Sequence, residues 1–154
     1  MNINNSDDCF YRYKMPYLNI TNYGKGNGKF TNLNNINDIC NSINTPLKIL
    51  MMYLTQSLGT NYKDTSLNGH YNKNEITDLI IKFNKEFIVC NKCDIPELSP
   101  ILEGKKKNIK LFYQCSACGE KYEKTSDNKI NSKIIDCIIN YYKVNKFIKT
   151  NGNV

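Results

Sequence analysis

Four cysteines in two Cys-x-x-Cys pairs constrain this 154-residue chain more than any other feature. Cys90 and Cys93 form the first pair, Cys115 and Cys118 form the second, and residues 94–114 separate them. Two residues between cysteines let both thiolates of one tight turn face a single ion. The spacer is long enough for a strand out and a strand back, which would place the second pair opposite the first. The spacing therefore predicts a zinc ribbon that holds one structural Zn²⁺ ion.

Other uses of these cysteines fit the pattern less well. A single Cys-x-x-Cys pair can act as a redox dithiol, but redox chemistry does not require two pairs, each after a predicted strand (87–89 and 111–115). The cysteine count of seven is odd and the N-terminus has no secretion signal, which argues against a disulfide framework. Four thiolates would leave no coordination position for a substrate, so we expect no zinc catalysis. We expect His70, the only histidine, in a turn or on the surface.

Charge and hydropathy narrow the classes of function. A net charge of +7 points to polyanionic partners such as RNA, although lysines that only solvate the surface would give the same balance. The chain has no apolar stretch of the roughly 20 residues that cross a bilayer, so we expect a cytoplasmic protein, without a membrane contact, that is a monomer. The sequence shows no Ser/His/Asp constellation and no phosphate loop, which disfavours an enzyme with its own active site.

The apolar pattern predicts an α+β protein, with a small α/β domain followed by a C-terminal zinc ribbon and a final helix. The stretch "GKGNGK" (24–29) contains three glycines and is typical of an interaction loop. The expected strands are 29–33, 66–67, 87–89 and 111–115, and the expected helices are 36–43, 47–58, 76–83 and 130–142. The expected units are a flexible N-terminal tail with the arginine (1–16), the α/β domain (17–86), the zinc ribbon (87–122), and the C-terminal helix and tail (123–154).

Arg12, in the stretch "FYRYKMP" (10–16), is the only arginine among 21 basic residues. A planar guanidinium can bridge two phosphoryl oxygens with a fixed fork of donors, whereas a lysine is a point charge. An arginine that enters a partner's site is best placed on a mobile tail with anchors nearby, and its aromatic and apolar neighbours could be those anchors. On the residues alone, a surface strand arginine with its aromatic neighbours packed on the core explains the stretch equally well.

Together, these stretches resemble a known family. "FYRYKMP" followed by "GKGNG" resembles the N-terminus of eukaryotic translation initiation factor five. "NINDICNSI", "MMYLTQSLGT", "EFIVCNKC" and "LFYQCSACG" resemble the α/β and zinc-ribbon unit that this factor shares with the beta subunit of initiation factor two. The resemblance runs from Phe10 to Glu120. Two positions depart from the family pattern, because the lysine after the glycine loop is displaced by one, to Lys29, and Met52 precedes Tyr53 where the family has a lysine.

The resemblance implies a GTPase-activating function and a set of site residues. In factor five, the arginine of the matching heptapeptide is thought to act in trans on GTP bound to the gamma subunit of initiation factor two, and here that residue is Arg12. The implied zinc ligands are Cys90, Cys93, Cys115 and Cys118. The implied partner-binding residues are Phe10, Tyr11, Tyr13, Lys14, Met15, Lys25 and Lys29. The implied partners are GTP-bound initiation factor two with initiator tRNA, and the small ribosomal subunit with its rRNA.

A beta-subunit-like module, which binds the GTPase or RNA without activating hydrolysis, is the main alternative. The beta subunit lacks the heptapeptide that carries the arginine, so Arg12 favours the factor-five interpretation. The C-terminal helical-repeat domain of factor five and the lysine blocks of the beta subunit have no counterpart in these 154 residues. We therefore do not expect scaffolding through those parts.

Overall fold

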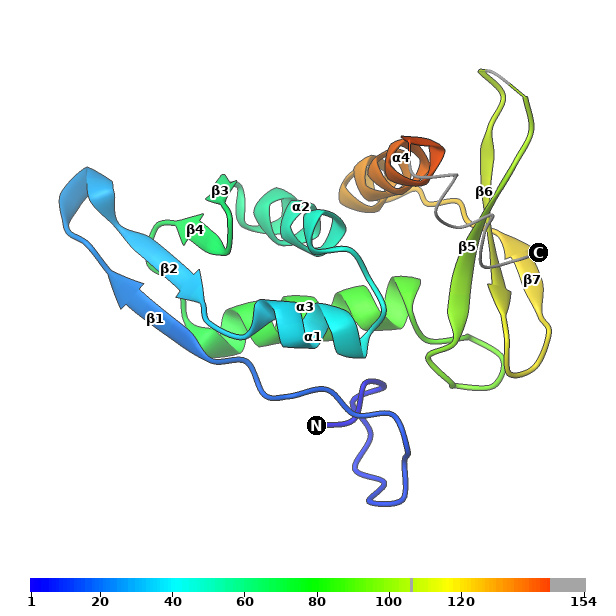
Figure 1. The fold of residues 1–154 in the computed structure, drawn as a ribbon, viewed down its shortest axis with the longest axis horizontal. Coiled ribbons are helices and arrows are strands. Elements are labelled where there is room, and N and C mark those ends of the chain that lie inside the picture. Colours follow the sequence, from blue (N-terminus) through cyan, green and yellow to red (C-terminus); the bar gives the residue numbers. More distant parts are fainter. Residues whose placement is uncertain (106, 145–154) are drawn as a thin grey trace.

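Figure 1 shows two β-sheets at opposite ends of the molecule, with helices between them. The structure is a computed structural model that describes residues 1–105 and 107–144. Its elements in chain order are β1 (Ile20–Tyr23), the 3-10 turn η1 (Gly26–Gly28), β2 (Phe30–Leu33), α1 (Ile36–Ser42), α2 (Leu47–Leu58), β3 (Tyr62–Lys63), β4 (Ser66–Asn68), α3 (Lys73–Phe87), β5 (Leu98–Glu103), β6 (Lys110–Cys115), β7 (Lys121–Glu123) and α4 (Lys129–Val144). The mixed helices and sheets confirm the predicted α+β class.

The first sheet holds four short antiparallel strands in the order β1-β2-β4-β3. β1 and β2 form a hairpin in which Tyr23 pairs with Phe30 next to the turn. The turn is the glycine loop, where Gly24 has a φ of +84° and an added Cβ would lie 1.8 Å from the Gly28 carbonyl oxygen. No side chain fits at that position, so the loop requires glycine there. The sheet confirms two predicted strands, 29–33 and 66–67.

The two helices after the hairpin are amphipathic, as predicted for residues 36–43 and 47–58. α2 ends at Gly59, which adopts the left-handed conformation (φ +67°) and donates its N–H to the Thr55 carbonyl. This is the common glycine C-terminus of an α-helix. Across residues 1–105 and 107–144, the structure contains no helix with both the length and the apolar character needed to cross a bilayer.

α3 is longer than predicted and replaces an expected strand. The helix runs from Lys73 to Phe87, and Ile88 still has helical backbone angles (φ −116°, ψ −44°). The predicted strand 87–89 is therefore wrong. Phe87 lies four residues after Phe83, on the same face of the helix, and both rings are buried. Burial of this face outweighs the β propensity of the Phe-Ile-Val run, which depends on context.

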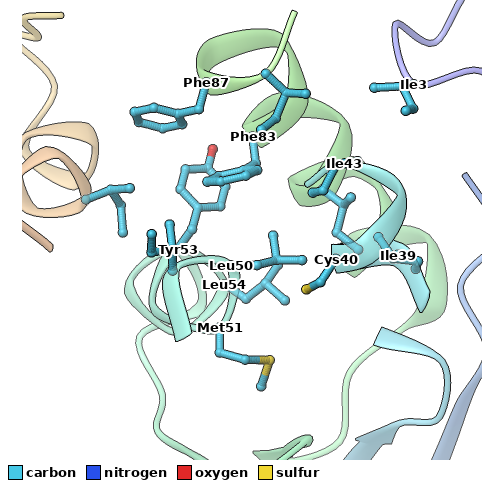
Figure 2. Close-up of a cluster of buried hydrophobic side chains, with 14 of the residues drawn as sticks. Ile3, Ile39, Cys40, Ile43, Leu50, Met51, Tyr53, Leu54, Phe83 and Phe87 are labelled. Atoms are coloured by element: carbon cyan, nitrogen blue, oxygen red, sulfur yellow. The ribbon is translucent and has the colours of Figure 1, made fainter. Parts of the chain in front are cut away.

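A buried aromatic group joins α2 to α3 (Figure 2). Tyr53 of α2 lies edge-on to Phe83, with ring centroids 5.2 Å apart, and Phe83 lies 5.1 Å from Phe87. Leu50 and Leu54 of α2 belong to the same buried cluster and are fully enclosed. This group forms the centre of the core, against which α1 also packs its buried face.

The second sheet, β5-β6-β7, is the ribbon. β5 pairs with β6 from Leu98 opposite Cys115 to Glu103 opposite Lys110. The spacer between the two cysteine pairs thus runs out along one strand and back along the next, as predicted. The predicted strand 111–115 is confirmed within β6.

α4 joins the ribbon to the helical layer (Figure 1). It packs against α2 and also contacts β5 and β6. Its buried residues are Ile134, Ile135 and Ile138. The predicted helix 130–142 is confirmed, and the predicted tail beyond it, 145–154, lies outside the described residues.

A buried lysine closes the seam between the ribbon and α3. Lys124 follows β7, and its ammonium lies 2.7 Å from the Glu86 carboxylate and 2.8 Å from the Glu86 carbonyl oxygen. The same ammonium lies 5.1 Å from the centre of the Phe87 ring. A buried ammonium with two acceptors and an aromatic face has its charge compensated.

The N-terminal loop, residues 1–16, differs from the expected flexible tail because it is anchored at its base. Ile3 and Met15 are buried, with 3% and 4% of their surface exposed. The Ile3 N–H donates to the Tyr13 carbonyl at 3.1 Å, and the Met15 N–H donates to the Met1 carbonyl at 2.9 Å. Two isolated apolar side chains in a polar stretch therefore hold both ends of the loop in the core.

We expect Phe83→Ala to lower the free energy of unfolding by about 3–5 kcal/mol, because it empties a buried site between two other rings. Urea denaturation followed by far-UV circular dichroism measures the change. Phe10→Ala is the control, because Phe10 is 91% exposed. It should change the free energy of unfolding by less than about 0.5 kcal/mol. Equal effects of the two substitutions would contradict this assignment of the core.

Candidate functional site

The four paired cysteines lie on two turns of the same shape. Cys90 follows α3, and Cys115 is the last residue of β6. The Asp94 N–H donates to the Cys90 carbonyl, and the Gly119 N–H donates to the Cys115 carbonyl, each at 2.9 Å. Asp94 and Gly119 both have positive φ, 59° and 79°. The first and second knuckles are residues 90–94 and 115–119.

The knuckles bring four sulfur atoms around one point. The Cys90 and Cys118 sulfurs are 3.7 Å apart, and the Cys93 and Cys115 sulfurs are 3.6 Å apart. All four sulfurs lie within 4.8 Å of one another, and each belongs to a free thiol. Metal–sulfur bonds of about 2.3 Å in a tetrahedron give sulfur–sulfur distances of about 3.8 Å. The cluster therefore fits one four-coordinate metal ion and could hold it without another ligand.

Backbone N–H groups favour the thiolate form of Cys90. Burial acts to raise the pKa of this thiol, but the N–H groups of Cys93 and Lys92 outweigh burial and lower the pKa to about 7. The Lys92 nitrogen lies 3.4 Å from the sulfur. A thiolate is the form that binds a metal. Across the cluster, the Lys92 ammonium pairs with the Glu120 carboxylate at 3.1 Å and links the two knuckles.

Two tyrosines hold the tip of the N-terminal loop beside the first knuckle. The Tyr11 hydroxyl donates to the Asp94 carbonyl at 3.0 Å, and the Tyr13 hydroxyl donates to the Glu97 carboxylate at 2.5 Å. The Asn4 side chain donates to the Asp94 carboxylate at 2.8 Å. Burial and the nearby Asp94 raise the pKa of Tyr11 to about 12, and the hydrogen bond to Glu97 raises the pKa of Tyr13. Both hydroxyls therefore remain protonated donors at neutral pH.

Arg12 lies between these tyrosines, with its side chain exposed. Its guanidinium carbon is 5.9 Å from the centre of the Tyr13 ring. In the part of the chain that the structure describes, every ion pair is formed by a lysine, and Arg12 takes part in none. The guanidinium fork is therefore open to an acceptor on another molecule.

The other predicted residues of the N-terminal loop divide into exposed and buried groups. Phe10, next to Arg12, is almost fully exposed. Lys14 is exposed and donates to the Asn2 side-chain oxygen at 2.8 Å. Met15, which we expected among the partner-binding residues, lies in the core and supports the loop from beneath. In this structure only a movement of the loop would bring Met15 to a partner.

Lys25 and Lys29 lie apart from the arginine, on the glycine loop of the β1–β2 hairpin. Figure 1 places this hairpin at the other end of the molecule from the ribbon. The Tyr23 and Phe30 rings stack next to the loop, with centroids 5.5 Å apart. His70 is exposed there, with its Nε2 atom 2.8 Å from the Tyr23 carbonyl oxygen. The hairpin is therefore a second surface and not part of the arginine segment.

The sequence analysis missed the acceptors that hold the tyrosines. Asp94 and Glu97 lie in the spacer after the first cysteine pair, 83 and 84 residues away from Tyr11 and Tyr13. No local pattern links residues at that separation. The one available signal was the pair of tyrosines two positions apart, because partly buried hydroxyls usually find a hydrogen-bond partner.

Comparisons with known proteins cover both the arginine segment and the metal cluster. The family model for the domain found in initiation factors 2B and 5 matches residues 3–121. The chain is 33% identical to "Eukaryotic translation initiation factor 5" of Caenorhabditis elegans over 142 residues, which are 88% of this chain and 32% of that protein. The protein of the same name from Saccharomyces cerevisiae is 32% identical over 134 residues, covering 83% of this chain and 32% of that protein. The chain spans about a third of the length of these curated relatives.

We expect the whole chain to retain one divalent metal ion after dialysis against a weak chelator, and Cys115→Ser to retain almost none. The substitution removes one of four thiolates from a closed tetrahedral site. Atomic emission spectroscopy measures the metal per chain. Cys9→Ser is the matched control, because Cys9 is an exposed cysteine outside the cluster, and it should keep the ion. A full equivalent of metal in Cys115→Ser would contradict the assignment of these ligands.

Proposed function

Because the chain belongs to the family of the domain found in initiation factors 2B and 5, we propose that it is a translation initiation factor of the factor-five type that activates GTP hydrolysis by the gamma subunit of initiation factor two. Its curated relatives are named as translation initiation factors. The observation that carries the proposal is Arg12, an exposed guanidinium on an anchored loop, without a carboxylate partner among the described residues.

Arg12 acts in trans, at a nucleotide that the partner binds. GTP hydrolysis spreads negative charge over the phosphoryl oxygens in the transition state, and a guanidinium can donate to two of these oxygens at once. An arginine supplied in this way is worth about 10³–10⁵ in rate. The chain contributes no active site of its own, so it is an activator and not an enzyme. Phe10, beside Arg12, offers an exposed apolar contact for the partner.

The metal of the ribbon is a structural Zn²⁺ ion. Four-thiolate tetrahedral sites are typical of structural zinc, which supplies folding free energy and keeps no position open for a substrate. Cys90, Cys93, Cys115 and Cys118 hold the ion, and their sulfur spacing fits this coordination.

The partners are those of translation initiation in the cytoplasm. GTP-bound initiation factor two with initiator tRNA receives the arginine, and the small ribosomal subunit with its rRNA is a second partner, to which the monomeric chain's net charge of +7 is suited. A second candidate function, a binding module of the beta-subunit type without activation, is favoured by one observation. Lys25 and Lys29, beside the Tyr23–Phe30 stack, form a basic and aromatic surface apart from Arg12 that suits single-stranded RNA.

We expect Arg12→Ala to lower the rate of phosphate release from initiation factor two, loaded with GTP and initiator tRNA on small ribosomal subunits, by about 10³-fold or more relative to the unaltered chain. Arg12→Lys should recover only part of the loss, because an ammonium cannot bridge two oxygens. Single-turnover phosphate release measures both variants.

Lys82→Ala is the control for the loss of one positive charge, because Lys82 is exposed on α3 and lies outside the arginine segment. It should leave the rate unchanged. Unaltered phosphate release by Arg12→Ala, with unaltered binding to the complex, would reject activation and favour the binding module.

A further inference from the structure

We propose that the first metal knuckle positions Arg12, with Tyr11 and Tyr13 as the positioning residues that transmit the order of the metal site to the guanidinium. The proposal rests on the function proposed for Arg12 and assigns a role to contacts outside the reacting groups. It links the two features that the sequence presents separately, the lone arginine and the cysteine cluster.

The contacts run from the arginine segment to the loop that follows the first cysteine pair. Tyr11 donates to the Asp94 carbonyl and Tyr13 donates to the Glu97 carboxylate, at 3.0 and 2.5 Å. Their rings also touch edge to face, with centroids 5.8 Å apart. Both tyrosines therefore face the knuckle from the same side of the segment.

The position of Arg12 follows from this arrangement. In an extended segment, residues two apart face the same side and the residue between them faces the other. With Tyr11 and Tyr13 turned toward the knuckle, Arg12 is turned toward solvent, and its side chain is exposed. The sequence Tyr-Arg-Tyr thus presents the guanidinium outward by fixing its two neighbours.

The loop that accepts the tyrosines is bonded to both knuckles. The Cys90 N–H donates to the Ile95 carbonyl at 3.0 Å, and the Ser116 N–H donates to the Glu97 carbonyl at 3.1 Å. These donors belong to a metal-ligating residue and to the neighbour of another. Metal binding at the four thiolates therefore also fixes the loop that offers Asp94 and Glu97 to the tyrosines.

The base of the N-terminal loop does not depend on the metal site. Ile3 and Met15 are buried in the core, and the Ile3 N–H donates to the Tyr13 carbonyl. Loss of the metal should consequently free the tip, where Arg12 lies, and leave the base folded. This difference between tip and base gives a measurement that does not depend on activity.

The test compares the unaltered chain with the double variant Tyr11→Phe/Tyr13→Phe, which removes two hydroxyls and keeps both rings. We expect the backbone order parameter of Arg12, measured by nuclear magnetic resonance on the zinc-loaded chain, to fall from about 0.85 to below about 0.6. We expect the maximal rate of stimulated phosphate release to fall about 10- to 100-fold, with a smaller change in the activator concentration that gives half of that rate.

Two further variants separate positioning from folding. Glu97→Gln retains a carbonyl oxygen that can accept from Tyr13 and should keep most of the order at Arg12, whereas Glu97→Ala should not. Tyr17→Phe is the matched control, because Tyr17 is 70% exposed and lies on the same segment beyond the contacts. It should change neither the order parameter nor the rate.

Metal removal is the second arm. Chelation should lower the order parameter of Arg12 while the Ile3 amide stays protected from hydrogen exchange. An ordered Arg12 in the metal-free chain, or in the double tyrosine variant, would overturn the proposal. If Arg12→Ala releases phosphate at the unaltered rate while the double variant loses order, the activating function fails and the positioning of the segment stands.

Discussion

The four-thiolate cluster is the constraint on which the rest of this structure depends. A ribbon of three short strands has little core of its own, and a structural metal can supply about 10–16 kcal/mol of apparent binding free energy to such a lobe. The lobe is then secured to the helices by α4, which packs on α2 and on the ribbon, and by Lys124 over the Phe87 ring. The same cluster fixes the loop against which the arginine segment rests. One site therefore braces both ends of the domain's matched region, residues 3–121.

The parts of the fold that the sequence predicted are those with a local pattern. The Cys-x-x-Cys spacing predicted the ribbon and its ligands, and apolar periodicity predicted α1, α2 and α4. The strand expected at 87–89 was wrong because Phe87 completes a buried helical face with Phe83, a tertiary contact that outweighs strand propensity. The anchored N-terminal loop was missed because its contacts join residues more than 80 positions apart.

Composition explains the second miss as well. Asparagine, isoleucine and lysine are used throughout the chain, so an isolated Ile3 among asparagines carries no visible signal of burial. The same bias makes a single arginine less informative by itself than it would be in a balanced sequence. What distinguishes Arg12 is its setting, because Tyr11 and Tyr13 are both bonded to the knuckle loop while the guanidinium between them stays exposed.

An arginine that acts on a partner's nucleotide has to satisfy two opposing requirements. A guanidinium bonded to its own carboxylate would have to break that pair before it reached the phosphates, whereas a wholly mobile one would lose entropy on entering the site. Hydrogen bonds through the neighbouring tyrosines avoid both costs, because they order the backbone and leave the fork of donors unused. Two such bonds contribute only about 0.5–1.5 kcal/mol each. The tip is therefore ordered enough to aim the arginine and weakly enough held to adjust when it meets the GTPase.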